Sequence, residues 1–273
     1  MHLAPGIIDI GVKICEPGER HKESFRSASE SASKGGVTTL VTRADTKPAI
    51  DNPEILEFFK QRASDSSQVR IFPSAAITKK TKGKIMTEIG FLHQGGAIAF
   101  SDGLKSISDT RIYYQILKYA ADFEVLIIGH PQDNFLSKNT SATKSIFSSL
   151  KGISSSPNIS EKIGLERDTA LIQNLSLRYH ADQITTKEGL EALRLSKKKN
   201  NKITAGTSIH HFIFNELDIG NYRTFFKLKP PLRTHSDREA LIEAIKDGTV
   251  DNICSMHTPQ DEESKRLPYE EAA

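Results

Sequence analysis

The feature of this sequence that most constrains its fold is a series of eight short apolar runs. Segments with helix-forming signals separate these runs. The runs are typical of strands that are covered on both faces, as in parallel sheets. Strands that alternate with helices predict parallel βαβ units, and eight such units indicate a closed (β/α)8 barrel. A doubly wound open sheet is the alternative, although no GxGxxG motif follows the first run, which disfavours its dinucleotide-binding version. The expected strands are Ile7–Val12, Thr38–Thr42, Val69–Pro73, Ala97–Phe100, Val125–Ile128, Arg178–Ala181, Ile203–Gly206 and Val250–Cys254.

Capping residues, glycines and prolines mark the helices expected between these strands. Gly35-Gly36 ends the first helix, Asn52-Pro53 opens the second, and Asp109 caps the third. Thr185 with Glu188, and Ser236 with Glu239, have the capping-box spacing. The expected helices are Lys22–Lys34, Glu54–Ala63, Thr110–Ala121, Lys187–Lys199 and Asp237–Lys246.

Two stretches are longer than ordinary connections. Ser137–Glu161 is rich in serine and is expected to be a long mobile loop. Ile209–Thr234 follows the seventh strand, where barrel enzymes build their sites. After the eighth strand the sequence leaves room for little of an eighth helix, so we expect residues 1–273 to form one barrel domain.

Composition argues against several classes of partner. The formal net charge of +3 is too small to indicate nucleic acid by itself. The basic run Lys197–Lys199 lies where a helix should end, and there the helix dipole explains it more simply than a phosphate site does. No apolar run approaches the ~18 residues that a membrane span needs. With two cysteines and no signal-peptide pattern, we expect a cytoplasmic protein.

The end of the first strand is the first place to look for chemistry. Residues just past the C-terminal end of a barrel strand face the reaction centre. Here these residues are Gly11, Lys13 and Cys15. The functional question therefore depends on what a glycine, a lysine and a cysteine can do there.

Ordered motifs along the chain resemble those of the dihydroorotases of the cyclic amidohydrolase superfamily. That resemblance implies a distorted (β/α)8 barrel with one or two zinc ions. It also implies an enzyme of pyrimidine synthesis that opens the dihydroorotate ring by hydrolysis or closes it. A further implication is a small β-sandwich, which we do not expect the residues of this sequence to form. The motifs are Pro5–Asp9, Glu16–Gly18, Gly35–Thr39, Ala99–Gly103, His130 with Asp133, Pro230–Arg233, Asp237–Leu241, Asp247–Asp251 and His257–Pro259.

The same resemblance places substitutions at most metal positions. Gly11 and Lys13 stand at the two first-strand histidines, Gln183 at the sixth-strand histidine, and Met256 at the aspartate that is the family's general base. Only Asp102 and His130 keep the chemistry of a ligand, fewer than the three that a catalytic zinc takes from protein. The substrate-pocket positions are Cys15, in place of an arginine, Asp45 and Lys229, each in place of an asparagine, and His257.

Simpler roles remain open for several of these residues. Asp102 could form the turn after the fourth strand, and His130 could make a structural hydrogen bond. Lys13 could pair with Asp45 or Asp102 and fill the vacated metal site. His210 and His211 look like ligands, but neighbours on an extended strand face opposite ways. Cys15 could act as a nucleophile beside His130 or His257, although it lacks a known cysteine-hydrolase context.

Two functional interpretations follow. The favoured one is a catalytically silent dihydroorotase homologue that acts as a structural or partner-binding subunit. Its partner by resemblance is aspartate transcarbamoylase, and a homo-oligomer is the other assembly considered. The alternative is an active dihydroorotase, or another cyclic-amide hydrolase, with an altered zinc site.

Overall fold

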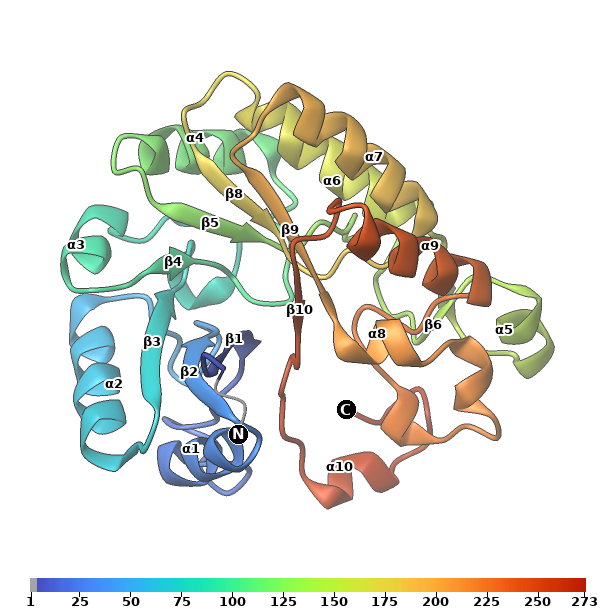
Figure 1. Ribbon diagram of the computed structural model, residues 1–273, viewed down its shortest axis with the longest axis horizontal. Helices are drawn as coiled ribbons and strands as arrows, with labels where there is room; N and C mark the ends of the chain where they lie inside the picture. Colours follow the sequence, from blue (N-terminus) through green and yellow to red (C-terminus); the bar gives the residue numbers. More distant parts are fainter. Residues whose placement is uncertain (1–3) are drawn as a thin grey trace. The chain divides into compact units, whose positions relative to one another are not determined.

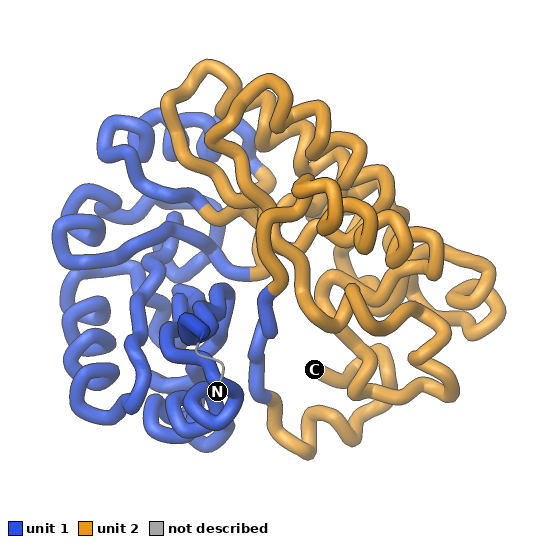
Figure 2. Tube along the Cα trace, viewed as in Figure 1, with its two compact units in different colours: residues 1–103, 109–127, 254–259 blue, residues 104–108, 128–253, 260–273 orange. Residues whose placement is uncertain are grey.

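A computed structural model describes residues 4–273 of the chain. Its contacts divide into two compact units, which Figure 2 colours blue and orange. Unit 1 comprises Met1–Gly103, Asp109–Ile127 and Cys254–Pro259, and unit 2 comprises Leu104–Ser108, Ile128–Ile253 and Gln260–Ala273. Each unit combines parallel strands with helices, and each is described by itself below.

Unit 1 is a run of parallel strands connected by helices (Figure 1). Each strand pairs in parallel with the next one along the chain, from β1 through to β5. Parallel pairing requires a crossover between strands, which the helices provide. Its elements are β1 (Ile7–Val12), α1 (Phe25–Lys34), β2 (Val37–Thr42), α2 (Pro53–Ser66), β3 (Arg70–Ala75), η1 (Lys79–Thr81), α3 (Ile89–Gln94), β4 (Ala99–Phe100), α4 (Thr110–Ala121) and the first half of β5 (Leu126–Gly129).

Buried aromatic side chains hold the first two helices of unit 1 together. Phe25 on α1 and Phe59 on α2 are both fully buried, and their rings meet edge to face at 4.8 Å between centroids. Burial of each such ring stabilises the fold by about 1.5–3 kcal/mol, and the edge-to-face geometry adds about 1 kcal/mol. The loop after β1 contacts both helices, because Glu16 accepts from the Phe25 N–H and from Arg62.

Unit 2 contains further parallel strands that are connected by helices, and a separate pair of short strands. β8 pairs in parallel with β9, with His180 opposite Thr204, and β6 pairs in parallel with β7. Its elements are the second half of β5, β6 (Ala142–Thr143), α5 (Ile146–Lys151), β7 (Ser155–Ser156), α6 (Ile159–Ile172), β8 (Arg178–Ala181), α7 (Lys187–Lys199), β9 (Ile203–Ser208), α8 (Ile209–Ile213), η2 (Glu216–Ile219), η3 (Thr224–Phe226), α9 (His235–Lys246), β10 (Asn252–Cys254) without its last residue, and α10 (Glu262–Arg266).

The long serine-rich stretch is not the plain loop that its composition predicts. Residues 137–161 contain β6, α5 and β7. Ala142 and Ile153 from this stretch pack with Ile219 and Tyr269, which lie far along the sequence, in one buried cluster. The stretch between β9 and α9 is likewise structured, with α8, η2 and η3 in it. Long-range apolar contacts therefore order segments whose local composition favours loops.

Several predicted bounds of strands and helices are correct, but two of the predicted capping residues are not. β1, β8, α4 and α7 have the predicted bounds. α7, however, is capped by the hydroxyl of Thr186, and α9 begins at His235 with Thr234 as its cap. The capping boxes predicted at Thr185 and Ser236 were therefore each one or two residues out of place.

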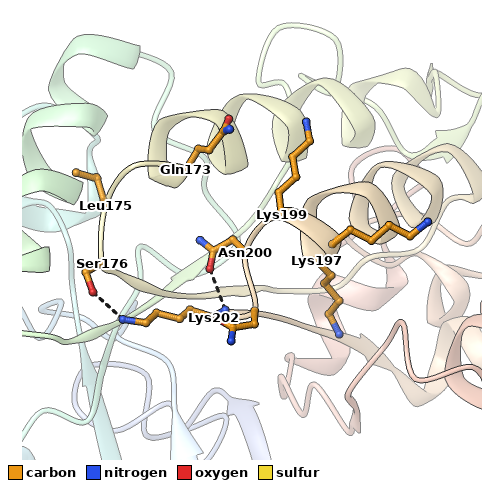
Figure 3. Close-up of a pocket in the computed structure, with 9 residues that line it drawn as sticks. Gln173, Leu175, Ser176, Lys197, Lys199, Asn200 and Lys202 are labelled. Carbon is orange, nitrogen blue, oxygen red and sulfur yellow. Dashed lines mark hydrogen bonds between the residues drawn. The ribbon is translucent and has the colours of Figure 1, made fainter.

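The basic run lies at the end of a helix, as the sequence predicts. Lys197, Lys198 and Lys199 form the last turn of α7 (Figure 3). Cations there interact favourably with the carbonyl end of the helix dipole. In residues 4–273, no helix is both long enough and apolar enough to cross a membrane.

Candidate functional site

Gly11, near the end of β1 in unit 1, is the candidate position whose side chain is least able to bind a metal. Gly11 has a φ of +78°, and a Cβ added to it would lie 2.7 Å from the Sδ atom of Met256 and 3.1 Å from its Cε. Met256 itself has a φ of +50°. The methionine side chain therefore fills the space beside Gly11, and a larger residue at position 11 would require the end of this side chain to shift.

Lys13 is held by an acidic neighbour on the loop after β1. Its Nζ lies 3.5 Å from Glu19 Oε2, and its backbone N–H donates to the carbonyl of His257 at 2.8 Å. Glu19 also accepts from Lys22 at 2.8 Å and Lys47 at 3.0 Å. The hydrogen bond from Lys22, more than any other contact, lowers the pKa of Glu19 to about 2. The ion pair that Lys13 makes here is therefore with Glu19, whereas Asp45 and Asp102 were the partners considered from the sequence.

The two candidate site aspartates of unit 1, Asp45 and Asp102, are engaged in other contacts. Arg43 donates to Asp45 through two nitrogens, at 3.0 Å and 2.6 Å. Asp102 accepts from the backbone N–H groups of Ile77 and Thr78 at 2.9 Å each, and from the Thr78 hydroxyl. Asp102 therefore ties the end of β4 to the segment after β3, which favours the structural role over a ligand role.

Cys15 and His257 do not form a nucleophile–base pair. Cys15 is buried, its Sγ lies 4.0 Å from the Pro259 carbonyl oxygen, and burial raises the pKa of its thiol. Because the thiolate is the nucleophile, a raised pKa works against nucleophilic catalysis. His257 Nε2 lies 2.7 Å from Glu23 Oε1, and this hydrogen bond raises the pKa of His257.

In unit 2 the sixth-strand position is also unsuited to a metal. Gln183 is buried with a φ of +56°, and its amide nitrogen has no hydrogen-bond partner among the described residues. His180 is buried beside Thr204, at 2.9 Å from Nδ1 to Oγ1, and burial lowers the pKa of His180 to about 4. His130 is also buried, and its carbonyl accepts from the Gln132 N–H at 2.9 Å.

The adjacent histidines His210 and His211 lie on a short helix and not in an extended conformation. Both belong to α8. His211 is buried; its Nδ1 lies 2.8 Å from the Ser208 hydroxyl, and its Nε2 lies 3.1 Å from the Pro230 carbonyl oxygen. Burial lowers the pKa of His211 to about 3. His211 therefore supports the segment that contains the exposed Lys229 and the cis-Pro230.

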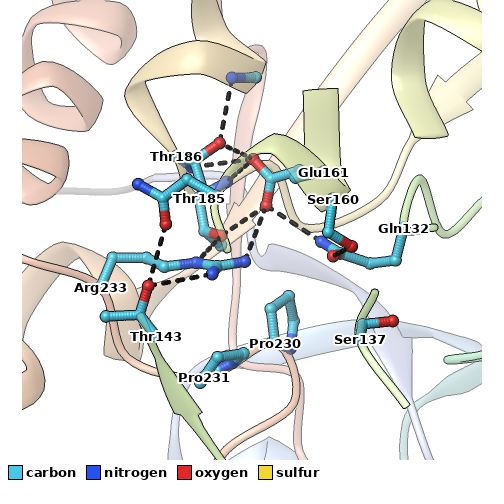
Figure 4. Close-up of polar contacts among 12 residues, drawn as sticks. Gln132, Ser137, Thr143, Ser160, Glu161, Thr185, Thr186, Pro230, Pro231 and Arg233 are labelled. Atoms are coloured by element: carbon cyan, nitrogen blue, oxygen red, sulfur yellow. Dashed lines mark hydrogen bonds and ion pairs between the residues drawn. The ribbon is translucent and has the colours of Figure 1, made fainter. Parts of the chain in front are cut away.

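A buried ionic network underlies the most distinctive motif, and sequence reasoning missed its acidic member (Figure 4). Arg233 lies 3.4 Å from Glu161 Oε2 and donates to the Thr185 hydroxyl at 2.9 Å. Glu161 is fully buried and accepts from the backbone and hydroxyl groups of Thr185 and Thr186. The network joins the start of α6 to the starts of α7 and α9. Its only sequence signal is a glutamate in the first turn of α6.

The donors present do not fit the zinc site that the resemblance implies. Zinc binds thiolates, imidazoles and carboxylates. Gly11 offers no donor, the ammonium group of Lys13 is donor-only, and the thioether of Met256 cannot accept a proton from water. Within residues 4–273, no three or more histidine, cysteine, aspartate or glutamate side chains are grouped so that they could hold a metal ion.

A family model and similar curated proteins point to one family. A family model described as "Dihydro-orotase-like" matches residues 2–189. A dihydroorotase from Bacillus pumilus is 36% identical over 272 residues, which cover 100% of this chain and 64% of that protein. The chain therefore spans less than two thirds of the length of such relatives.

Solved structures show the fold. An L-hydantoinase from Arthrobacter aurescens matches 98% of this chain and 61% of its own, with a TM-score of 0.84 at 18% identity. A dihydroorotase from Saccharomyces cerevisiae, solved with 5-fluoroorotic acid, matches 98% of this chain and 74% of its own, with a TM-score of 0.76 at 15% identity. The predicted (β/α)8 barrel class is confirmed.

The contact between Gly11 and Met256 predicts a measurable coupling. Gly11→Ala should lower the free energy of unfolding by about 2–3 kcal/mol, because strain at positive φ costs about 1 kcal/mol and the collision with Met256 adds to it. In a Met256→Ala background the cost should fall to about 1 kcal/mol. Gly36→Ala is the control, because Gly36 has a φ of +77° with nothing within 4 Å of its Cβ position. Urea unfolding measures all four variants, and equal costs for Gly11→Ala in both backgrounds would contradict the contact.

The buried ion pair predicts a large loss of stability. Arg233→Met should lower the free energy of unfolding by about 3–5 kcal/mol, because it leaves the Glu161 carboxylate buried without its cation. Arg194→Met is the matched control, because Arg194 pairs with Asp247 at 2.9 Å on an exposed surface, where such pairs contribute about 1 kcal/mol or less. Similar losses for the two variants, measured by urea unfolding, would show that the network does not stabilise unit 2.

Proposed function

Because the chain belongs to the dihydroorotase-like family, we propose that it acts in pyrimidine biosynthesis as a member that does not hydrolyse dihydroorotate. In this proposal the barrel is kept as a structural or partner-binding scaffold. Its relatives named dihydroorotase support the pathway, and the substitutions at the strand ends support the loss of chemistry. The chain covers 64% of such a relative, so the proposal concerns this part of the protein.

The observation that carries the proposal is the contact of Gly11 with Met256. The resemblance assigns a metal ligand to the first position and the general base to the second. Here a thioether fills the space beside a glycine, at 2.7 Å from the point where a side chain would begin. Neither side chain is a zinc ligand, and neither can take a proton from water.

Hydrolysis of a cyclic amide needs a nucleophilic water, a base for its proton and a group that stabilises the developing oxyanion. The polar residues at the end of β1 and β4 serve other contacts. Lys13 is paired with Glu19, and Asp102 holds the segment after β3. A buried thiol with a raised pKa, that of Cys15, supplies no replacement nucleophile.

The partner in this proposal is aspartate transcarbamoylase in the cytoplasm, with self-association as the other assembly. The support is the family resemblance alone. Co-expression of the tagged full-length protein with the aspartate transcarbamoylase of the same organism tests it. The proposal predicts a stable complex on size-exclusion chromatography. Two separate peaks at micromolar concentrations of both proteins would contradict this partner.

Zinc content tests the loss of the metal site. The purified protein, incubated with zinc and desalted, should retain less than about 0.1 zinc ion per chain, because fewer than three protein ligands remain. A variant that combines Gly11→His, Lys13→His, Gln183→His and Met256→Asp restores the family's ligand types and is the positive comparison. Elemental analysis gives the stoichiometry. One zinc ion per chain in the unaltered protein would overturn the proposal in favour of an active enzyme with an altered site.

A further inference from the structure

The end of α7 borders a cationic pocket that the proposed function does not use (Figure 3). The pocket has a volume of about 390 Å³ and lies between the last turn of α7 and the segment before β8. Four lysines line it, with neutral side chains between them and no carboxylate: Lys197, Lys198, Lys199 and Lys202. Every lining residue belongs to unit 2.

The positive charge exceeds what nearby negative groups neutralise. Lys197 pairs with Asp251 at 2.7 Å, and Lys202 donates to the Ser176 hydroxyl at 2.7 Å. Lys198 and Lys199 make no ion pair or side-chain hydrogen bond within residues 4–273, and both are exposed. The C-terminal end of a helix carries only about half a negative charge. A recess of one sign of charge concentrates ions of the other sign.

A second, less polar groove adjoins this pocket. It has a volume of about 240 Å³ and lies between α6 and α7. Ala170, Ala192 and Leu195 give it apolar walls, and it shares Lys199 with the cationic pocket. Leu195 is 59% exposed, so an apolar side chain stands uncovered beside the lysines. Together the two hollows have the size of an ordinary small-molecule site.

From this arrangement we infer that the end of α7 binds an organic phosphate of the size of a nucleotide. The phosphate groups contact the lysine ammonium groups, which form charge-assisted hydrogen bonds with phosphate oxygens. The apolar or aromatic part of the ligand lies in the groove against Leu195. The inference does not depend on the proposed function, because no residue of the β1 or β10 ends takes part.

Two probes separate the phosphate part of this site from the apolar part. Isothermal titration of the full-length protein with inorganic triphosphate should show binding that weakens as salt is raised, since exposed charges are screened. ATP should bind more tightly than triphosphate, because its base adds contacts in the groove. Failure of both probes to bind at millimolar concentration in low salt would overturn the inference.

Matched variants test the assignment to these residues. Lys198→Glu with Lys199→Glu should weaken both probes by about tenfold or more. The control is Lys34→Glu with Lys118→Glu, because these exposed lysines also lie in last helical turns, those of α1 and α4. The control makes the same change in net charge. Equal weakening in the two double variants would show nonspecific attraction and would overturn the site.

The groove has a test of its own. Leu195→Ala should remove the advantage of ATP over triphosphate and leave triphosphate binding unchanged. Leu150→Ala is the control, since Leu150 is 83% exposed on α5 and lines neither hollow. If Leu195→Ala leaves the ATP advantage intact, the ligand does not use the groove, and the inferred ligand class is wrong.

Discussion

The chemistry available at the end of β1 depends on one close contact, that of Gly11 with the side chain of Met256. Because a Cβ at position 11 would lie 2.7 Å from Sδ, the two positions constrain each other. A larger side chain at position 11 requires the end of the Met256 side chain to shift. In the proposed loss of the metal site, the residues at positions 11 and 256 are therefore coupled by packing.

The family's signature persists because its residues also hold the fold. Glu16 accepts from the Phe25 N–H at 3.1 Å and from Arg62 at 2.8 Å. Asp9 accepts from the Ser255 N–H at 2.9 Å, and Arg233 lies in the buried network with Glu161. Removing such partners would expose or orphan buried polar groups, at a cost of about 1–3 kcal/mol each. Motifs of the family can thus remain recognisable for reasons of stability alone.

Local signals account for the parts of the fold that could be predicted. The alternation of apolar runs and capped helices predicts β1, β8 and α4 to the residue. The strands β6 and β7 could not be predicted, because Ile219 and Tyr269 order them from far along the chain. The partner of Lys13 was missed for a similar reason, since Glu19 approaches it through a loop of irregular shape. Sequence motifs located the candidate positions, but only the structure showed what occupies their surroundings.

Turnover is the most direct test of the central claim. The whole protein, supplied with excess zinc, is assayed for opening of the dihydroorotate ring and for closure of N-carbamoyl-aspartate, with the Bacillus pumilus dihydroorotase as a positive control. The account predicts no turnover above the rate without protein in either direction. Turnover that scales with protein concentration and disappears on chelation would contradict it.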